Sequence, residues 1–107
     1  MDRLQQIFDC QKKLQYKIAN VELPQEIPEL ITTHVTGLVA ELGEVLQADK
    51  RWKPWCKNPP EPESRERRLD EAADMLTFLV NIILMSGFDA DEIYNAFVDK
   101  NKVNNKN

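Results

Sequence analysis

Two pairs of acidic residues are the part of this sequence best suited to chemistry. Glu41 and Glu44 stand three residues apart, as do Glu71 and Asp74, and 26 residues (45–70) separate the two pairs. Residues three apart on a helix share a face and lie close together. Two such helices packed side by side would direct four carboxylates at one point, where repulsion and desolvation oppose them unless a cation is present. Oxygen ligands of this kind suit Mg²⁺, with Mn²⁺ as the alternative.

A single acidic pair of this kind is also typical of an exposed helix surface. Here both pairs lie in apolar, helix-periodic segments (37–48 and 68–84), and Glu41 and Glu44 lie at the edge of the apolar arc. The two interpretations are therefore a metal site and a solvated acidic seam. A di-iron centre is disfavoured because it needs a Glu-x-x-His motif from each of two helices. The chain has one histidine, His34, and Ile31 occupies the position three before it.

Two further polar residues share the helix faces of the acidic pairs. His34 lies two turns before Glu41, and Asn81 lies two turns after Asp74. His34 is predicted either to reach a phosphate or base, or to be a surface or interface histidine. Asn81 is predicted either to contact a sugar or base, or to be a buried amide bonded across an interface, because a buried amide needs a partner.

Basic and aromatic residues follow each acidic segment. Trp52, Lys53, Trp55 and Lys57 lie in a proline-rich loop (51–63). The tryptophans are predicted to stack on a base, with lysines such as Lys53 meeting phosphates, or else to fix the loop to the helices.

A polar, basic tail ends the sequence and contains Lys100, Asn101 and Asn104. It is predicted to be either a phosphate clamp or a frayed helix end. The arginines at 65, 67 and 68 are expected to be surface partners of glutamates 61, 63 and 71.

Four helices are expected to position these residues, at roughly 2–20, 28–50 and 65–86, with a fourth that begins after Asp89 and dissolves into the polar tail at 99–107. Asp2, Ser64 and Asp89 are the predicted N-caps, with Glu92 as capping-box partner of Asp89. Pro28 is predicted in a first turn, and residue 87, a glycine, as the end of the third helix. We expect one all-α domain (1–107). The third helix is apolar almost all round in its second half, which predicts a subunit interface there.

Composition narrows the class of protein. The chain has 107 residues, of which 42% are hydrophobic and 30% charged, with a net charge of −4 and a pI of about 5.0. This is typical of a globular protein and gives no basic surface for a nucleic acid polymer. Cys10 and Cys56 form no metal-like spacing and are expected to be reduced thiols. The longest apolar run, 75–85, is far shorter than the ~20 residues of a membrane span, and the N-terminus does not resemble a signal peptide. A cytoplasmic location is expected.

Taken together, the motifs resemble the all-α nucleoside triphosphate pyrophosphatases, the MazG-like and dimeric dUTPase superfamily. The sequence reads ELGE at 41–44, EAAD at 71–74 and a late KN-x-x-N at 100–104, and the resemblance extends over residues 1 to about 105. It implies a four-helix bundle completed by oligomerisation as a homodimer or homotetramer. It further implies Mg²⁺ ligands and substrate contacts. The implied ligands are Glu41, Glu44, Glu71 and Asp74. The implied contacts are Lys100, Asn101 and Asn104, and more weakly Asn81 and Trp55.

The activity implied is hydrolysis of a nucleoside triphosphate to the monophosphate and pyrophosphate. Of the acidic residues, Glu44 is preferred over Glu41 as the general base. The expected substrate is dUTP or a non-canonical dNTP. The alternatives are dCTP, a broad house-cleaning activity of the MazG-like kind, or a non-catalytic helical interaction module.

Overall fold

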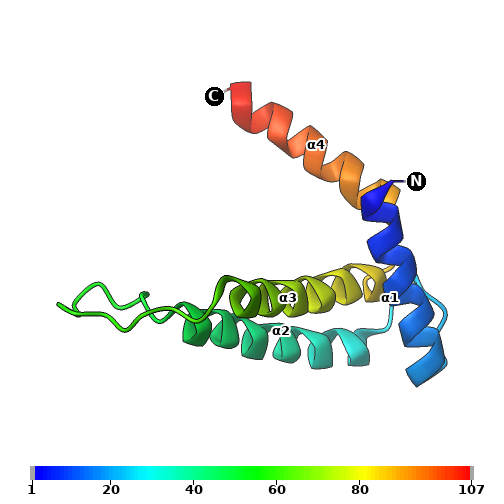
Figure 1. Ribbon diagram of the computed structural model, residues 1–107. Helices are drawn as coiled ribbons and strands as arrows, with labels where there is room; N and C mark the ends of the chain where they lie inside the picture. The colour runs from blue at the N-terminus through cyan, green and yellow to red at the C-terminus, as the bar shows by residue number, and fades with distance from the viewer. Residues whose placement is uncertain (1, 107) are drawn as a thin grey trace.

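The computed structural model describes residues 2–106 and confirms the all-α class (Figure 1). Its helices are α1 (Arg3–Ala19), α2 (Pro28–Asp49), α3 (Arg65–Met85) and α4 (Ala90–Lys106). Between residues 2 and 106, strand-like pairing is confined to one isolated antiparallel bridge from Glu26 to Ser86. No helix in this range is long and apolar enough to span a membrane.

The predicted helix starts are confirmed by hydrogen bonds. The side chains of Asp2 and Ser64 accept bonds from backbone N–H groups two and three residues later, at 2.9 and 3.2 Å. Asp89 and Glu92 form a reciprocal capping box with bonds of 2.8 and 3.2 Å. Pro28 is the first residue of α2, where the missing N–H costs no helical hydrogen bond.

The prediction that the fourth helix dissolves into the polar tail was wrong. α4 continues through this segment to Lys106. The segment contains no glycine or proline, and Asn105 donates a hydrogen bond of 2.9 Å to the side chain of Asn101 one turn earlier. Lys100 and Lys102 lie in the C-terminal half of the helix, where positive charges interact favourably with the negative end of the helix dipole.

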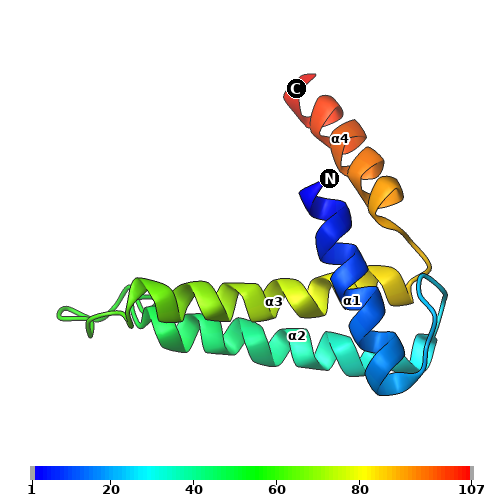
Figure 2. The same ribbon diagram turned by 45° about the vertical axis from the view of Figure 1, so that its right-hand side comes forward.

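The helices form an antiparallel pair, α2 with α3, crossed by α1 at the end where α2 begins and α3 ends (Figures 1 and 2). A small core forms at this crossing, where Phe8 of α1 packs with Val80, Leu84 and Met85 of α3. The connector between α1 and α2 closes the core through Leu23 and is bonded by its backbone to the last turn of α3. In both views α4 leaves the crossing and points away from the α2–α3 pair.

Much apolar surface remains uncovered in the single chain. α1 and the connector bury part of the apolar second half of α3, but Leu76 and Leu79 stay 41% and 43% exposed. α2 carries a stripe of exposed apolar residues at helical spacing, which we call the α2 stripe: Val35, Val39, Leu42 and Leu46. The radius of gyration is 16.7 Å, against about 13 Å for a compact domain of this length. The chain on its own is therefore open.

A glycine sets how closely α2 approaches α3. A Cβ atom placed on Gly37 would overlap the ring of Phe78, with 2.8 Å to Cδ1 of that ring. Gly43, two turns further along α2, has no atom within 4 Å of such a Cβ. Gly37 therefore provides the space that the Phe78 ring occupies.

We predict that Gly37→Ala destabilises the protein by about 1–3 kcal/mol, because the added methyl group forces the Phe78 ring or the helix to move. Gly43→Ala is the matched control, and it should stabilise the protein by up to about 1 kcal/mol through helix propensity alone. Urea unfolding followed by circular dichroism measures both. Equal effects of the two substitutions would contradict the proposed close approach.

Candidate metal centre

Several of the predicted residues face each other along the line where α2 packs antiparallel against α3. We call this line of contact, from His34 and Asn81 to Glu44 and Arg67, the seam. His34 of α2 lies opposite Asn81 of α3, their side-chain nitrogens 3.4 Å apart, and Gly37 then lies against Phe78. The next layers toward the loop contain the acidic residues and then Arg67. Steps of three and four residues along α2 match the same steps backwards along α3, so contact between one pair, such as Gly37 and Phe78, places the remaining layers opposite each other.

Three of the four predicted carboxylates converge in the middle of this seam. Glu41, Glu71 and Asp74 each offer one oxygen atom, and these atoms all lie within 4.8 Å of one another. Glu41 comes from α2 and the other two from α3, so the cluster depends on the helix pairing. Glu41 and Glu71 are partly buried, whereas Asp74 is exposed. The cluster is therefore open to solvent on one side.

The cluster is strained electrostatically. Burial raises the pKa of Glu41 above its ordinary value, and the nearby charges of Asp74, Glu71 and Glu44 raise it further. Its Oε2 atom is buried and has no hydrogen-bond partner among the described residues. A buried carboxylate oxygen without a partner is unfavourable.

A divalent cation would relieve both sources of strain. It would neutralise converging negative charge and would coordinate the unpartnered Glu41 oxygen. The donor set contains oxygen only, which fits Mg²⁺ or Mn²⁺ better than zinc or copper. The residues of the cluster therefore fit a hard divalent cation, bound with water filling the remaining positions.

Glu44, the fourth predicted ligand, lies outside this cluster. It lines a neighbouring cavity of about 80 Å³ together with Glu71, Arg67, Glu63, Gln47 and Ala48. Glu71 thus belongs to both the cluster and the cavity. A step of three residues turns a helix by about 300°, so Glu44 is rotated by about 60° from Glu41 and displaced along the axis. Glu71 and Asp74 have the same offset on α3 and both reach the cluster, so the exclusion of Glu44 depends on how α2 faces α3.

His34 and Asn81, predicted as separate substrate contacts, meet each other. Asn81 Nδ2 lies 3.4 Å from His34 Nδ1, and the His34 ring lies 5.6 Å from that of Phe78. Burial lowers the pKa of His34, which favours the neutral ring with Nδ1 as acceptor. Asn81 is 2% exposed, and its Oδ1 atom has no partner within residues 2–106. One amide acceptor therefore stays unpaired beside the seam.

Two glutamines of α1 were missed by the sequence analysis. Gln15 is 5% exposed, and Gln11 has a buried Oε1 atom without a partner in the described part of the chain. Both follow Leu4 and Phe8 at helical spacing, on the face that α1 turns toward the core. Both glutamines continue the apolar stripe of α1, and this placement in the sequence could have identified them as buried polar residues.

The two tryptophans of the loop after α2 lie against each other. Trp55 is 71% exposed and meets Trp52 edge-on with ring centroids 6.2 Å apart, while the Lys53 amino group lies 5.2 Å from the Trp52 ring. Trp52 and Lys53 line a cavity of about 390 Å³ that shares Gln47 with the cavity of Glu44. Gln47 therefore borders both cavities, and Trp55 stays on the surface.

The predicted contacts on α4 are not brought to the cluster. Lys100 and Asn104 line a shallow cavity formed by α4 alone, and α4 points away from the α2–α3 pair (Figure 2). Asn101 is exposed and bonded to Asn105. In this chain, these three residues and the carboxylates lie on separate parts of the molecule.

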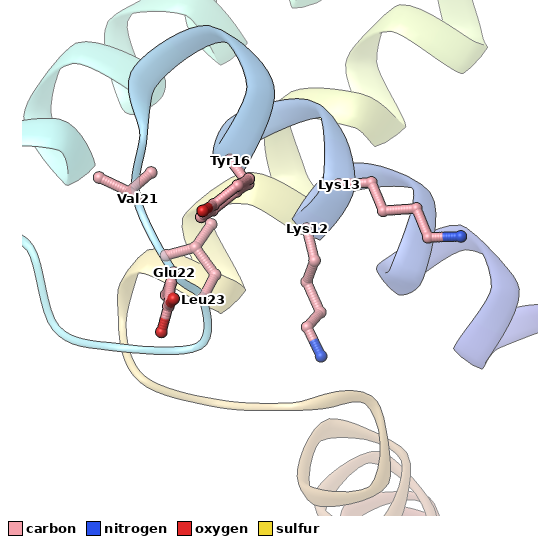
Figure 3. A pocket seen from close by; sticks show the side chains of 6 residues that line it. All are labelled: Lys12, Lys13, Tyr16, Val21, Glu22 and Leu23. Carbon is pink, nitrogen blue, oxygen red and sulfur yellow. The ribbon is translucent and has the colours of Figure 1, made fainter.

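A cavity of about 370 Å³ lies between α1 and the connector, and no member of the carboxylate cluster lines it. Lys12, Lys13, Tyr16, Val21, Glu22 and Leu23 line it (Figure 3). The amino groups of the two lysines point in different directions and do not converge. This cavity therefore lacks the features of an anion site.

Fold and site together define an all-α protein with a carboxylate cluster on a helical hairpin. Residues 3–86 match the family model described as dUTPase, and the chain belongs to this family. The match covers α1 to the end of α3 and includes the entire seam, but not α4. No solved structure matches the chain.

Two curated relatives come from Enterobacteria phage T4. A dCTP pyrophosphatase is 26% identical over 136 aligned residues, which cover 96% of this chain and 78% of the relative. A DNA replication protein is 26% identical over 134 residues, covering 94% of this chain but 34% of the relative, so the chain spans about a third of it. Both alignments are longer than the 107 residues of this chain. The relatives therefore have internal residues that this chain lacks.

We predict that Mg²⁺ and Mn²⁺ raise the thermal unfolding midpoint, because a ligand that binds only the folded state stabilises it by about 2.7 kcal/mol at a concentration about 100 times Kd. Asp74→Asn should abolish the rise and leave the metal-free protein folded, since the substitution keeps the shape and removes repulsion. Asp70→Asn, an exposed neighbour on α3 outside the cluster, is the control. A rise that persists in Asp74→Asn would place the metal elsewhere.

Proposed function

We propose that the protein is a Mg²⁺-dependent nucleoside triphosphate pyrophosphohydrolase. The observation that carries the proposal is the cluster of Glu41, Glu71 and Asp74, with its unpartnered buried oxygen, at the centre of the seam. Membership of the dUTPase family and similarity to a dCTP pyrophosphatase support a nucleotide pyrophosphatase. These two names favour a pyrimidine deoxynucleotide, with dUTP as the first candidate and dCTP as the second.

Each acidic residue has a proposed role in the reaction. Glu41, Glu71 and Asp74 would hold Mg²⁺, which when bound would supply positive charge for the phosphate oxygens and for activation of water. Glu44, outside the cluster but adjacent through Glu71, accepts the proton of the attacking water. Water adds to one phosphorus of the α–β anhydride, the bridging oxygen leaves with the other phosphorus, and the products are the monophosphate and pyrophosphate.

The pair formed by His34 and Asn81 is the proposed site of base recognition. The Asn81 Oδ1 atom is an unpartnered acceptor that is buried in the single chain, so it must become accessible when the base binds. With Nδ1 accepting from Asn81, the neutral imidazole of His34 can donate from Nε2–H. A pyrimidine edge carries both donors and acceptors, and the Phe78 ring beside the pair offers an aromatic surface. Lys53 and Trp55 are proposed to contact the substrate from the loop after α2.

A second copy of the chain is proposed to cover the exposed apolar surface. The α2 stripe and exposed residues of α3 such as Leu79 lie on the hairpin that holds the cluster, and helices with such stripes pack readily into four-helix bundles. Lys100, Asn101 and Asn104 are proposed to contact phosphate or sugar after α4 moves or from the second copy. A homodimer is the simplest such assembly, and a homotetramer the alternative.

The activity is tested by measuring pyrophosphate release from a panel of canonical and modified dNTPs with and without Mg²⁺. We predict Mg²⁺-dependent release from a pyrimidine dNTP, and a loss of at least about 100-fold in Glu41→Gln, since a bound cation supplies several kcal/mol of stabilisation to the transition state. Asp70→Asn should retain activity. No release from any nucleotide by the unmodified protein would contradict the proposal and favour a non-catalytic helical module.

The assembly is tested by light scattering coupled to size-exclusion chromatography. We predict a dimer or tetramer for the unmodified chain and a monomer for Val39→Lys, because Val39 is 62% exposed at the centre of the α2 stripe and a buried charge there would lack a partner. Thr33→Lys, an exposed position on another side of α2, should leave the assembly intact. A monomeric unmodified protein would exclude this interface.

A further inference from the structure

Arg67 is a basic residue in contact with a member of the carboxylate cluster, Glu71. Its Nε atom lies 3.9 Å from Glu71 Oε1, and it lines the cavity that Glu71 shares with Glu44. Along that cavity wall the other charged residues, Glu44, Glu63 and Glu71, are all acidic. Arg67 was predicted to be a surface partner of a glutamate, and its ion pair with Glu71 confirms this contact. The ion pair alone does not explain why an arginine lines an otherwise acidic cavity.

The neighbouring basic side chains already have partners. Lys50 pairs with Glu63 at 3.1 Å, and Arg51 pairs with Asp49 at 2.7 Å. Arg68 donates from Nε to the Glu63 backbone carbonyl at 3.1 Å. These contacts tie the start of α3 to the end of α2 and the following loop. The contact of Arg67 with Glu71, at 3.9 Å, is longer than each of these contacts.

The ion pair of Arg67 with Glu71 is long, and its two side chains differ in exposure. The distance of 3.9 Å is at the outer limit of an ion pair, and the Arg67 side chain is 65% exposed while that of Glu71 is 14% exposed. Such a pair contributes little stability. A cation bound at the cluster would draw Glu71 toward itself and weaken the pair further. The planar guanidinium, with its fork of N–H donors, would then be available to bind phosphate oxygens in pairs.

We propose that Arg67 binds the pyrophosphate end of the substrate and so fixes the direction in which the nucleotide lies along the seam. The inference rests on the proposed function. Asn81 and Arg67 lie on opposite sides of Asp74, each seven residues away on α3, or about 10 Å along the helix. The base lies toward His34 and Asn81, the scissile anhydride at the carboxylates, and the leaving pyrophosphate in the cavity of Glu44 and Arg67.

The direct test is calorimetric binding of inorganic pyrophosphate, and separately of dUMP and dCMP, in saturating Mg²⁺. Arg67→Ala should weaken pyrophosphate binding by about tenfold or more, the scale of a lost charge-assisted hydrogen bond. Monophosphate binding should be unchanged. Arg67→Lys should be intermediate, because an ammonium supplies charge without the fork. Arg65→Ala, an exposed arginine two residues earlier on α3, is the matched control and should bind pyrophosphate normally.

A merely structural role for Arg67 makes a different prediction. If Arg67 only positions Glu71, Arg67→Ala should weaken Mg²⁺ binding and affect both products equally, and either result would overturn the proposal. Unchanged pyrophosphate binding in Arg67→Ala, or no pyrophosphate binding by the unmodified protein, would overturn it too. The proposed function fails separately, when the unmodified protein releases no pyrophosphate from any dNTP.

Discussion

The close antiparallel packing of α2 on α3 is the constraint on which the site depends. Gly37 admits the Phe78 ring, and this contact fixes both the spacing and the register of the two helices. One turn toward the loop, the same register brings Glu41 against Asp74 and Glu71. Moving either helix by one turn would separate Glu41 from Glu71 and Asp74. The packing of two uncharged residues, Gly37 and Phe78, therefore determines where the carboxylates meet.

Much of the fold was predictable from local sequence, because helix ends are set by local chemistry. Asp2, Ser64 and the capping box of Asp89 and Glu92 each act within three residues. The direction of α4 was not predictable, since it depends on the turn after α3 and on surface that this chain leaves uncovered. The extent of α4 was predicted wrongly, because a polar composition was taken as a sign of fraying although the segment has no helix breaker.

Spacing predicted the carboxylate site only in part. It placed each acidic pair on one helix face, but three residues are less than one full turn, so the two members of a pair point in directions about 60° apart. Both members of the α3 pair, Glu71 and Asp74, reach the cluster, but only Glu41 of the α2 pair does. Which residues face the partner helix depends on the register, and the register depends on a glycine and a phenylalanine that bear no charge. The meeting of His34 with Asn81 follows from the same register, because His34 lies seven residues before Glu41 and Asn81 lies seven residues after Asp74. These equal spacings place the two residues opposite each other only once Glu41 is known to face Asp74.

Two of the three buried side-chain oxygens without a partner in the described part of the chain, those of Glu41 and Asn81, belong to the seam, and the third belongs to Gln11 of α1. The polar groups that cap helices or join the loop to α3 have partners. Leaving a buried oxygen without a partner costs stability, and the small core of the single chain offers little to offset it. That cost is understandable if the seam is shaped for something it binds, with the cation as the first component and the nucleotide as the second. The family match, which spans the seam and stops before α4, agrees with the α2–α3 pair as the functional unit.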